Sequence, residues 1–168
     1  MKTPKIAYCD TGFIIRLISS TDPLHNNAVG YFQHFLTSEN CIFRLSSIAL
    51  AEYLVKGKIE ELPLNNIQLV AFNPFDATLA GDFANILFEA KSKGVLKVES
   101  RIMIQNDVKL MAQAQAGKAS FYITADTSSK TMYDILQQRG KLDYQFIDIH
   151  TSVANRFGLF DFENTTED

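Results

Sequence analysis

Short apolar runs alternate along this chain with segments in which apolar residues recur at helical spacing. Five runs have the length and composition of buried strands: residues 6–9, 41–45, 68–72, 121–124 and 145–149. Between them, apolar side chains recur three or four positions apart, which is typical of amphipathic helices. Strands joined by helices favour right-handed crossovers. The pattern therefore predicts an α/β fold of three layers, α/β/α, with a mainly parallel five-stranded sheet covered on both faces.

Capping residues indicate where several of these helices begin and end. Asp22 followed by Pro23 is typical of a helix start, with the aspartate as cap and the proline in the first turn. Asp76 can cap the helix after the third strand. Residues 91–100 lack periodicity and contain a glycine, so we expect a loop there. A helix over 129–139 is expected to stop at the glycine that follows it.

Length, composition and charge narrow the class of protein. With 168 residues, 46% of them hydrophobic and 21% charged, the chain resembles one ordinary globular domain. We expect the domain to span residues 1–160 and residues 161–168 to form a flexible acidic tail. No run is long enough to cross a bilayer and the first residues lack the shape of a signal peptide, which predicts a cytoplasmic protein with no membrane partner. A net charge of −3 argues against a protein that coats nucleic acid through a broad basic surface, but not against an enzyme that acts on it.

Four carboxylates lie in otherwise apolar stretches that are predicted to line the core. Asp10 and Asp126 each follow a predicted strand directly, while Glu52 and Asp107 lie on the apolar stripes of two helices. Open α/β sheets bind ligands at the carboxyl ends of their strands, so all four acids can converge at that edge. Four buried carboxylates would repel one another unless a cation lay between them. The pattern points to a divalent metal such as Mg²⁺, which prefers oxygen ligands, and to phosphate chemistry.

Each acid also has an ordinary structural explanation. Asp10 and Asp126 can cap the helices that follow them, Glu52 can extend into solvent, and Asp107 can pair with a neighbouring basic residue. Taken singly, these explanations are adequate. Taken together, they require four coincidences at one edge of the sheet, which favours the metal site.

Four segments resemble the motifs of the PIN-domain family, and within it the VapC-like toxin ribonucleases. Asp10-Thr11-Gly12 resembles the first acidic motif, at the end of the first strand. Residues 46–52 resemble the small-residue helix start that carries a conserved glutamate. Residues 106–114 are similar to the segment with the third acid, and residues 123–126 to the strand-plus-acid motif that closes the site. The resemblance extends over residues 6–149, and the order and spacing of the segments are more specific than any one of them.

The resemblance implies a doubly wound, PIN-like sheet of order 3-2-1-4-5 and Mg²⁺- or Mn²⁺-dependent endoribonuclease activity. It assigns metal binding and catalysis to the same four residues: Asp10, Glu52, Asp107 and Asp126. It also implies an RNA substrate, a homodimer and, for a toxin, a cognate antitoxin that covers the acidic pocket. Two features depart from the family pattern. Ser128 stands where many relatives carry another acid, and the chain has extra residues around 91–100 and at its C-terminus.

Other polar residues near the motifs allow less specific interpretations. Thr11 and Thr124 can orient the metal ligands through hydroxyl hydrogen bonds. A basic cluster in and beside the expected loop can guide the RNA backbone towards the metal: Lys91, Lys93, Lys97 and Arg101. A solvated loop without such a role is the alternative.

Two other functions remain open at this point. A PIN module that binds RNA or protein without cleaving it would carry the same motifs. A haloacid-dehalogenase-like phosphatase also places an aspartate after its first strand, but it needs a second acid two residues later, where this chain has Gly12. No Ser-His-Asp set competes, because we expect His25 and His34 on the surface of one helix and His150 at the end of the last strand.

Overall fold

The five predicted strands form one parallel sheet in the computed structural model, which describes residues 3–97 and 101–158, without the side chains of 101–103. The strands are β1 (Lys5–Cys9), β2 (Cys41–Ser46), β3 (Ile67–Val70), β4 (Phe121–Thr124) and β5 (Gln145–Asp148). Their order is β3-β2-β1-β4-β5, and every neighbouring pair is parallel. This confirms the predicted order. Strand order reverses beside β1, so the carboxyl ends of β1 and β4 lie next to each other at one edge.

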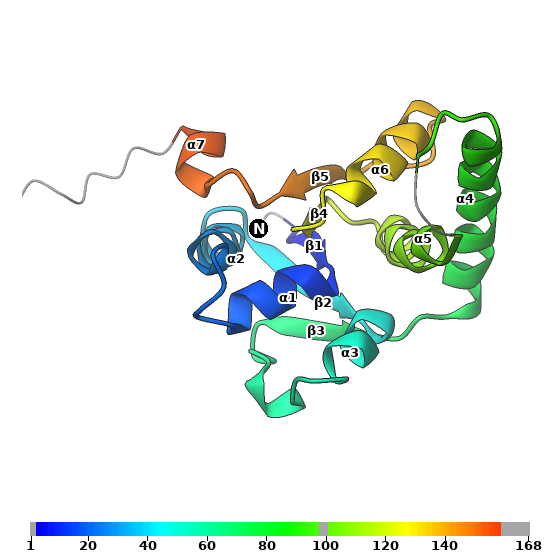
Figure 1. Cartoon of the computed structure of the whole chain (residues 1–168). Coiled ribbons are helices and arrows are strands. Elements are labelled where there is room, and N and C mark those ends of the chain that lie inside the picture. The colour runs from blue at the N-terminus through cyan, green and yellow to red at the C-terminus, as the bar shows by residue number, and fades with distance from the viewer. Residues whose placement is uncertain (1–2, 98–100, 159–168) are drawn as a thin grey trace, which may run out of the picture.

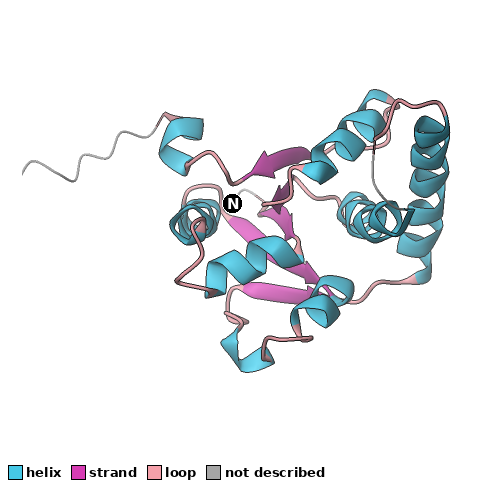
Figure 2. Cartoon of the chain, viewed as in Figure 1, coloured by secondary structure: helices cyan, strands magenta, loops and turns pink. Residues whose placement is uncertain are grey.

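Helices join the strands and cover both faces of the sheet (Figures 1 and 2). In the described part of the chain they are α1 (Thr11–Ile18), α2 (His25–Thr37), α3 (Ser47–Tyr53), α4 (Pro74–Ser92), α5 (Arg101–Ala116), α6 (Ser128–Gln138) and α7 (Val153–Phe157), with a 3₁₀ turn, η1, at Ile59–Glu61. None of the helices in these residues is long and apolar enough to cross a membrane.

Aromatic packing fixes the two faces of the sheet. On one face Phe43 of β2 packs against Phe13 of α1 and against Phe32 and Phe35 of α2, with ring centroids 4.7–6.5 Å apart. On the other face Tyr133 of α6 packs against the rings of Tyr144 and Phe146 at 5.7 and 5.1 Å. Side chains alternate between faces along a strand, so β1 contributes Ala7 to the first face and Tyr8 to the second.

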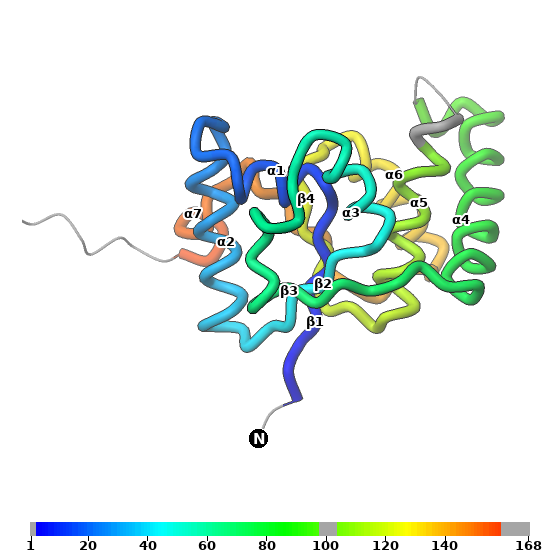
Figure 3. The backbone as a smooth tube through the Cα atoms, turned by 90° about the horizontal axis from the view of Figure 1, so that it is seen from below, coloured from blue at the N-terminus to red at the C-terminus, as the bar shows by residue number. Residues whose placement is uncertain are grey.

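Helix α4 is the outermost helix on its side of the molecule. Figures 1 and 3 both show α5 between α4 and the sheet, with the two helices side by side. Its inner face buries Phe83 and Leu87, and a three-residue extended connection joins it to the end of β3. Because α5 carries Asp107, the packing of α4 helps to hold that acid in place.

Several predicted boundaries are wrong, for reasons of local hydrogen bonding. Helix α2 begins at His25, because the Asp22 carboxylate accepts a hydrogen bond from the Leu24 amide at 2.8 Å and closes a separate turn. Asn73, and not Asp76, is the cap of α4; Asp76 completes the capping box from inside the helix. The third strand is Ile67–Val70 and so ends two residues earlier than predicted.

The expected loop at 91–100 begins later than predicted, because α4 continues to Ser92 and Lys93 is its C-terminal cap. Residues 98–100 lie outside the described residues, as does the predicted acidic tail at 161–168. The sequence pattern gave no prediction for η1 or α7. Helix α7 packs on α2, where Arg156 donates hydrogen bonds of 2.7 Å to the Tyr31 hydroxyl and to the Asp148 carbonyl.

Candidate active site

The four predicted acids line one pocket of about 200 Å³ at the carboxyl edge of the sheet. We call it the acidic pocket. Its lining comes from the ends of β1 and β4, from the first turn of α1, and from α3 and α5. The residues are Asp10, Thr11, Gly12, Glu52, Asn106, Asp107, Leu110 and Asp126. The convergence expected from the strand ends and helix faces is therefore present.

Asp10 is the buried acid of the pocket, with 9% of its surface exposed. It is also the cap of α1, since its Oδ1 accepts a hydrogen bond of 2.7 Å from the Phe13 amide. Its Oδ2 accepts a hydrogen bond from the Thr124 hydroxyl on the neighbouring strand. Burial raises the pKa of Asp10 to about 6, although both hydrogen bonds oppose the increase. The capping role and the site role are thus combined in one side chain.

Thr124 connects Asp10 to Asp126. While its hydroxyl donates to Asp10, it accepts a hydrogen bond of 2.8 Å from the Asp126 amide, which fixes the turn after β4. The Asp126 carboxylate accepts from the Ser128 amide and hydroxyl at 2.8 and 2.7 Å, through the same oxygen, at the start of α6. Ser128 therefore orients Asp126. Asp126 is exposed, so the expectation that it is buried is wrong.

Glu52 reaches the pocket from α3 and is also exposed, contrary to the prediction from its place on an apolar stripe. Helix α3 begins at Ser47, with the buried Ser46 as its cap, and is only seven residues long. It therefore leaves Glu52 close to solvent. The Thr11 hydroxyl donates to Glu52 and lies 3.3 Å from the Ala49 carbonyl, which ties α1 to α3. Both threonines thus contact an acid, as the sequence analysis expected.

Asp107 projects from α5 into the pocket and is partly buried. Its pKa is raised to about 7, first by burial and then by the negative charges of Asp126, Asp10 and Glu52. It forms no ion pair with Lys109 or with any other residue whose side chain is described, while the alternative partner, Arg101, has its side chain outside the described residues. The mutual repulsion shows that the four carboxylates share one electrostatic environment.

The donor set of the pocket fits a hard divalent cation. Carboxylate oxygens are the ligands that Mg²⁺ and Mn²⁺ prefer. Among residues 3–97 and 101–158, however, no three acidic, histidine or cysteine side chains are placed to hold one ion together. Carboxylates without a counter-ion repel one another, and Mg²⁺ usually takes only one or two of them, with water completing the shell. We therefore assign the four acids as candidate ligands without assigning a coordination geometry.

Sequence reasoning missed two features at the pocket. Asn106, next to Asp107, lines it with a polar side chain. Arg16, one helical turn after Gly12, donates from Nη1 to the Gly12 carbonyl at 3.0 Å, and its charge lowers the pKa of Asp10. A β-carbon on Gly12 would lie 3.4 Å from Arg16 Nη1 and 3.5 Å from Asp10 Oδ1. The i to i+4 spacing on α1 was the available signal for Arg16.

The three lysines of the predicted basic cluster do not line the acidic pocket. Lys91 lies in the last turn of α4, Lys93 pairs with Glu89, and Lys97 is exposed in the connection that follows. The side chain of Arg101 is outside the described residues. A role of these residues in guiding RNA stays a prediction.

Histidine chemistry does not compete with the acids. His150 is exposed after β5, as expected, with Nδ1 2.6 Å from Asp148. The expectation of a surface position is wrong for His34, which stacks on Phe157 at 4.4 Å and whose Nε2 is buried without a hydrogen-bond partner among the described residues. His25 is partly buried, and its Nδ1 lies 2.9 Å from the Arg16 carbonyl.

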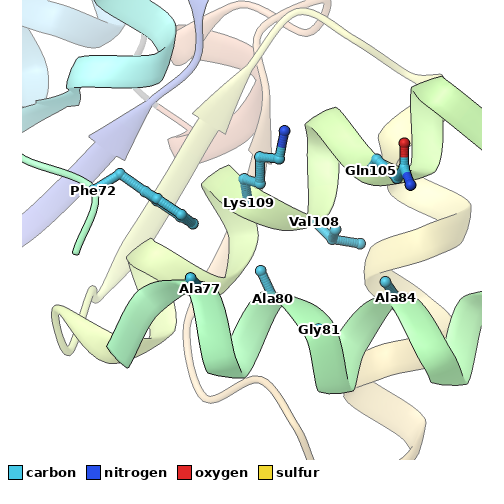
Figure 4. Close-up of a pocket in the computed structure, with 8 residues that line it drawn as sticks. All are labelled: Phe72, Ala77, Ala80, Gly81, Ala84, Gln105, Val108 and Lys109. Carbon is cyan, nitrogen blue, oxygen red and sulfur yellow. The ribbon is translucent and has the colours of Figure 1, made fainter. Parts of the chain in front are cut away.

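Two further cavities adjoin this region. The first, of about 610 Å³, lies between α1 and α3 beside Glu52 and is lined by Ile15, Ile18, Tyr53 and Val55. The second is a groove of about 340 Å³ between α4 and α5 (Figure 4). The small side chains of Ala77, Ala80 and Ala84 on α4 form one side, and Phe72 and Lys109 extend above it. Both are mainly apolar, whereas four carboxylates line the acidic pocket.

Of the comparisons with known proteins, the one with solved structures shows the fold of this chain. No protein-family model matches the sequence, and the search of curated proteins found no match. A chain of the crystal structure of VapBC2 from Rickettsia felis, bound to a DNA fragment from the promoter, is 20% identical with a TM-score of 0.56; the similarity covers 85% of this chain and 99% of that chain. A chain of DNA-bound VapBC from Salmonella typhimurium is 16% identical with a TM-score of 0.49, over 88% and 99% of the two chains. At such identities the similarity concerns the fold, and this chain has the PIN-like fold of VapC.

Proposed function

We propose that this protein is a divalent-metal-dependent endoribonuclease that hydrolyses RNA phosphodiester bonds. The observation that carries the proposal is the convergence of Asp10, Glu52, Asp107 and Asp126 in one pocket at the carboxyl edge of a PIN-like sheet. Unpaired carboxylates with raised pKa values would be costly if they served no ligand.

The chain's own residues would prepare the site for a metal and a phosphate. Asp10 and Asp126 are held in position by Thr124, and Glu52 is held by Thr11. Mg²⁺ or Mn²⁺ at these acids would lower the pKa of a bound water and neutralise negative charge that develops on the phosphate. Asp107 would lose its proton when the cation binds, because ligand carboxylates must be ionised. The alternative of a dehalogenase-like phosphatase has no support, since Gly12 provides no second acid.

A toxin role, with a cognate antitoxin as partner, is the more specific form of this proposal. It is supported by the shared fold with a chain of a VapBC complex and by the apolar cavity beside Glu52. Ile15 and Val55, which line that cavity, are 45% and 78% exposed. Exposed apolar residues next to a charged site favour a protein partner. We also propose a homodimer, which light scattering of the purified protein would test.

A cleavage assay tests the nuclease proposal. The purified protein would be incubated with mixed structured and single-stranded RNA in Mn²⁺, in Mg²⁺ or in EDTA. We expect metal-dependent cleavage that falls at least about 100-fold in Asp126→Asn, because a ligand or charged group of the site is lost. Asp82→Asn is the matched control, since Asp82 is exposed on α4 and does not line the acidic pocket.

The controls separate the alternatives. Thermal unfolding of Asp126→Asn must show a folded protein before its lost activity counts. Metal-independent RNA binding with intact RNA in every lane would favour the non-catalytic module. Cleavage that persists in EDTA or in the folded Asp126→Asn variant would contradict the metal mechanism.

A further inference from the structure

A second polar cavity, separate from the acidic pocket, lies on the face of the sheet that α5 covers. It has a volume of about 250 Å³ and shares no lining residue with the acidic pocket. Tyr8 of β1, Arg44 of β2, Phe75 and Asp76 of α4 and Gln113 of α5 contribute to its wall. We call it the Arg44 cavity. The proposed nuclease mechanism makes no use of these residues.

The Arg44 cavity carries two opposite charges that do not pair. Among the described residues, the Arg44 guanidinium contacts the Tyr8 hydroxyl and makes two long hydrogen bonds, of 3.4 Å to Gln68 Oε1 and 3.5 Å to the Gly117 carbonyl. Asp76 is buried, and its Oδ2 accepts a hydrogen bond of 2.9 Å from the Asn73 amide. Neither forms an ion pair within the described part of the chain. Charges left unpaired on the wall of one cavity suit a ligand that contacts both.

Gln113 provides a third unsatisfied group. Only 2% of its surface is exposed, and its Nε2 donates to the Ala71 carbonyl at 2.8 Å. Its Oε1 is buried with no hydrogen-bond partner in the residues that the structure describes. The opposite amide orientation would place Oε1 against the Ala71 carbonyl, so it would not relieve the deficit. A buried acceptor without a donor is costly, and a ligand N–H would satisfy it.

The polar groups define what a complementary ligand must offer. The cavity presents donors from Arg44 and Tyr8, and acceptors from Asp76 and Gln113. Its two formal charges cancel, which suits a neutral ligand better than a phosphate. Phe75, which is 68% exposed, adds an aromatic ring on which a planar ligand can stack. A neutral, planar ligand with adjacent acceptors and adjacent donors is required.

We propose that the Arg44 cavity binds a guanine base of the RNA substrate. Guanine presents O6 and N7 as acceptors for Arg44, and its N1–H and N2–H groups as donors for Asp76 and Gln113. Adenine would place its N1 acceptor opposite the carboxylate, which is unfavourable. The assignment to RNA rests on the proposed nuclease function, whereas recognition of guanine itself does not.

The position of the cavity suits a base close to the cleaved bond. Asp10 follows β1 directly with an extended backbone and stands two residues after Tyr8, so side-chain alternation directs both side chains to the same face of the sheet. Gln113 follows Asp107 by six residues on α5, a rise of about 9 Å. A short single strand would therefore reach both sites. Lys109 and Phe72 line the adjoining groove and provide a cation and a ring along this region (Figure 4).

Nucleotide binding tests the chemistry without any cleavage. In EDTA, we expect guanosine 5′-monophosphate to bind at least ~10-fold more tightly than adenosine 5′-monophosphate. The inosine nucleotide lacks the N2 donors and the 7-deazaguanosine nucleotide lacks the N7 acceptor, so each should bind several-fold more weakly. Arg44→Gln should weaken guanine binding ~10-fold, whereas Arg139→Gln, an exposed arginine at the end of α6, should leave it unchanged.

RNA experiments then identify the source of the base. Single-stranded oligonucleotides with one guanine, or inosine in its place, would be cut in Mn²⁺ and the cut sites mapped. We expect cuts at a fixed distance from guanine, and a lower guanine-to-adenine preference in Arg44→Gln. If guanosine monophosphate binds but the cuts lie at no fixed distance from guanine, the assignment to RNA would be overturned and the cavity would be a free-nucleotide site.

The two proposals can fail separately. If no RNA is cut, anisotropy of the same oligonucleotides on the metal-free Asp126→Asn variant still reports whether guanine is preferred. A guanine preference in that assay would support the Arg44 cavity even though the nuclease proposal had failed. Equal affinity for guanine and adenine, in nucleotides and oligonucleotides alike, would overturn the inference.

Discussion

Asp107 is the acid whose ionisation depends most on its neighbours. Its ordinary pKa of 3.8 is raised to about 7, because burial and three nearby carboxylates disfavour its charge. The pKa of Asp10 is also raised, to about 6. The folded protein therefore holds these protons more tightly than the unfolded chain does. This tighter proton binding contributes to the free energy of unfolding. The contribution is complete below pH ~4 and is lost as the pH rises through about 6 and then 7.

The first prediction follows from this linkage. In EDTA, the Tm of the wild type should fall between about pH 5 and pH 8, and Asp107→Asn should flatten that decline. Near pH 7.5 the variant should unfold roughly 2–8 °C above the wild type, because relief of the repulsion contributes on the order of 1–2 kcal/mol. Asp82→Asn is the control with the same charge change. Coincident Tm profiles for wild type and Asp107→Asn would show that the acids do not share an electrostatic environment.

At the scale of elements, α7 illustrates what local pattern does not reveal. It has five residues, too few for a periodic apolar face, and it is stabilised by tertiary contacts. Arg156 bridges the Tyr31 hydroxyl and the Asp148 carbonyl, and Phe157 stacks on His34. The helix therefore depends on residues more than a hundred positions earlier in the chain.

Replacement of Arg156 tests this dependence. Arg156→Met keeps a long stem but removes both hydrogen bonds, so we expect a loss of roughly 1–3 kcal/mol in the free energy of unfolding. Hydrogen exchange should increase in α7 and in the facing part of α2. Arg139→Met, at the exposed end of α6, should leave both unchanged. An equal stability of the two variants would mean that α7 does not support the fold.

The difference between local sequence pattern and tertiary contacts explains which elements and site residues could be predicted from the sequence. The strands and longer helices were found because their apolar periodicity is local, and the acids because they interrupt it. Exposure of Glu52 and Asp126 was not foreseen, because it depends on how short α3 is and on the turn after β4. The capping error at Asp76 arose because Asn73 and Asp76 cap reciprocally, and sequence alone does not reveal which residue precedes the helix. The Arg44 cavity was missed because its residues come from β1, β2, α4 and α5, with no shared motif.

At the scale of the whole molecule, the parallel sheet is what couples metal binding to folding. β1 and β4 are neighbours only in the folded chain, so Asp10 and Asp126 lie near each other only when residues 7–9 pair with 121–123. An ion that binds both acids therefore binds the native state in preference to the unfolded chain. Because the ion binds the native state preferentially, it raises the free energy of unfolding by mass action.

The third prediction concerns the pH dependence of that coupling. Near pH 7.5, Mn²⁺ at ~100 times its Kd should stabilise the wild type by about 2.7 kcal/mol, or roughly 5–11 °C in Tm. Near pH 5 the increase should be much smaller, because Asp10 and Asp107 are then protonated and each proton must be displaced before the ion binds. The metal and the proton thus act in opposite directions on the same carboxylates. Thermal unfolding with matched Mn²⁺ and EDTA samples measures this difference directly, with Asp82→Asn again as control. A Mn²⁺ effect of equal size at both pH values would place the ion elsewhere on the protein, and the acidic pocket would then need another ligand to explain its charge.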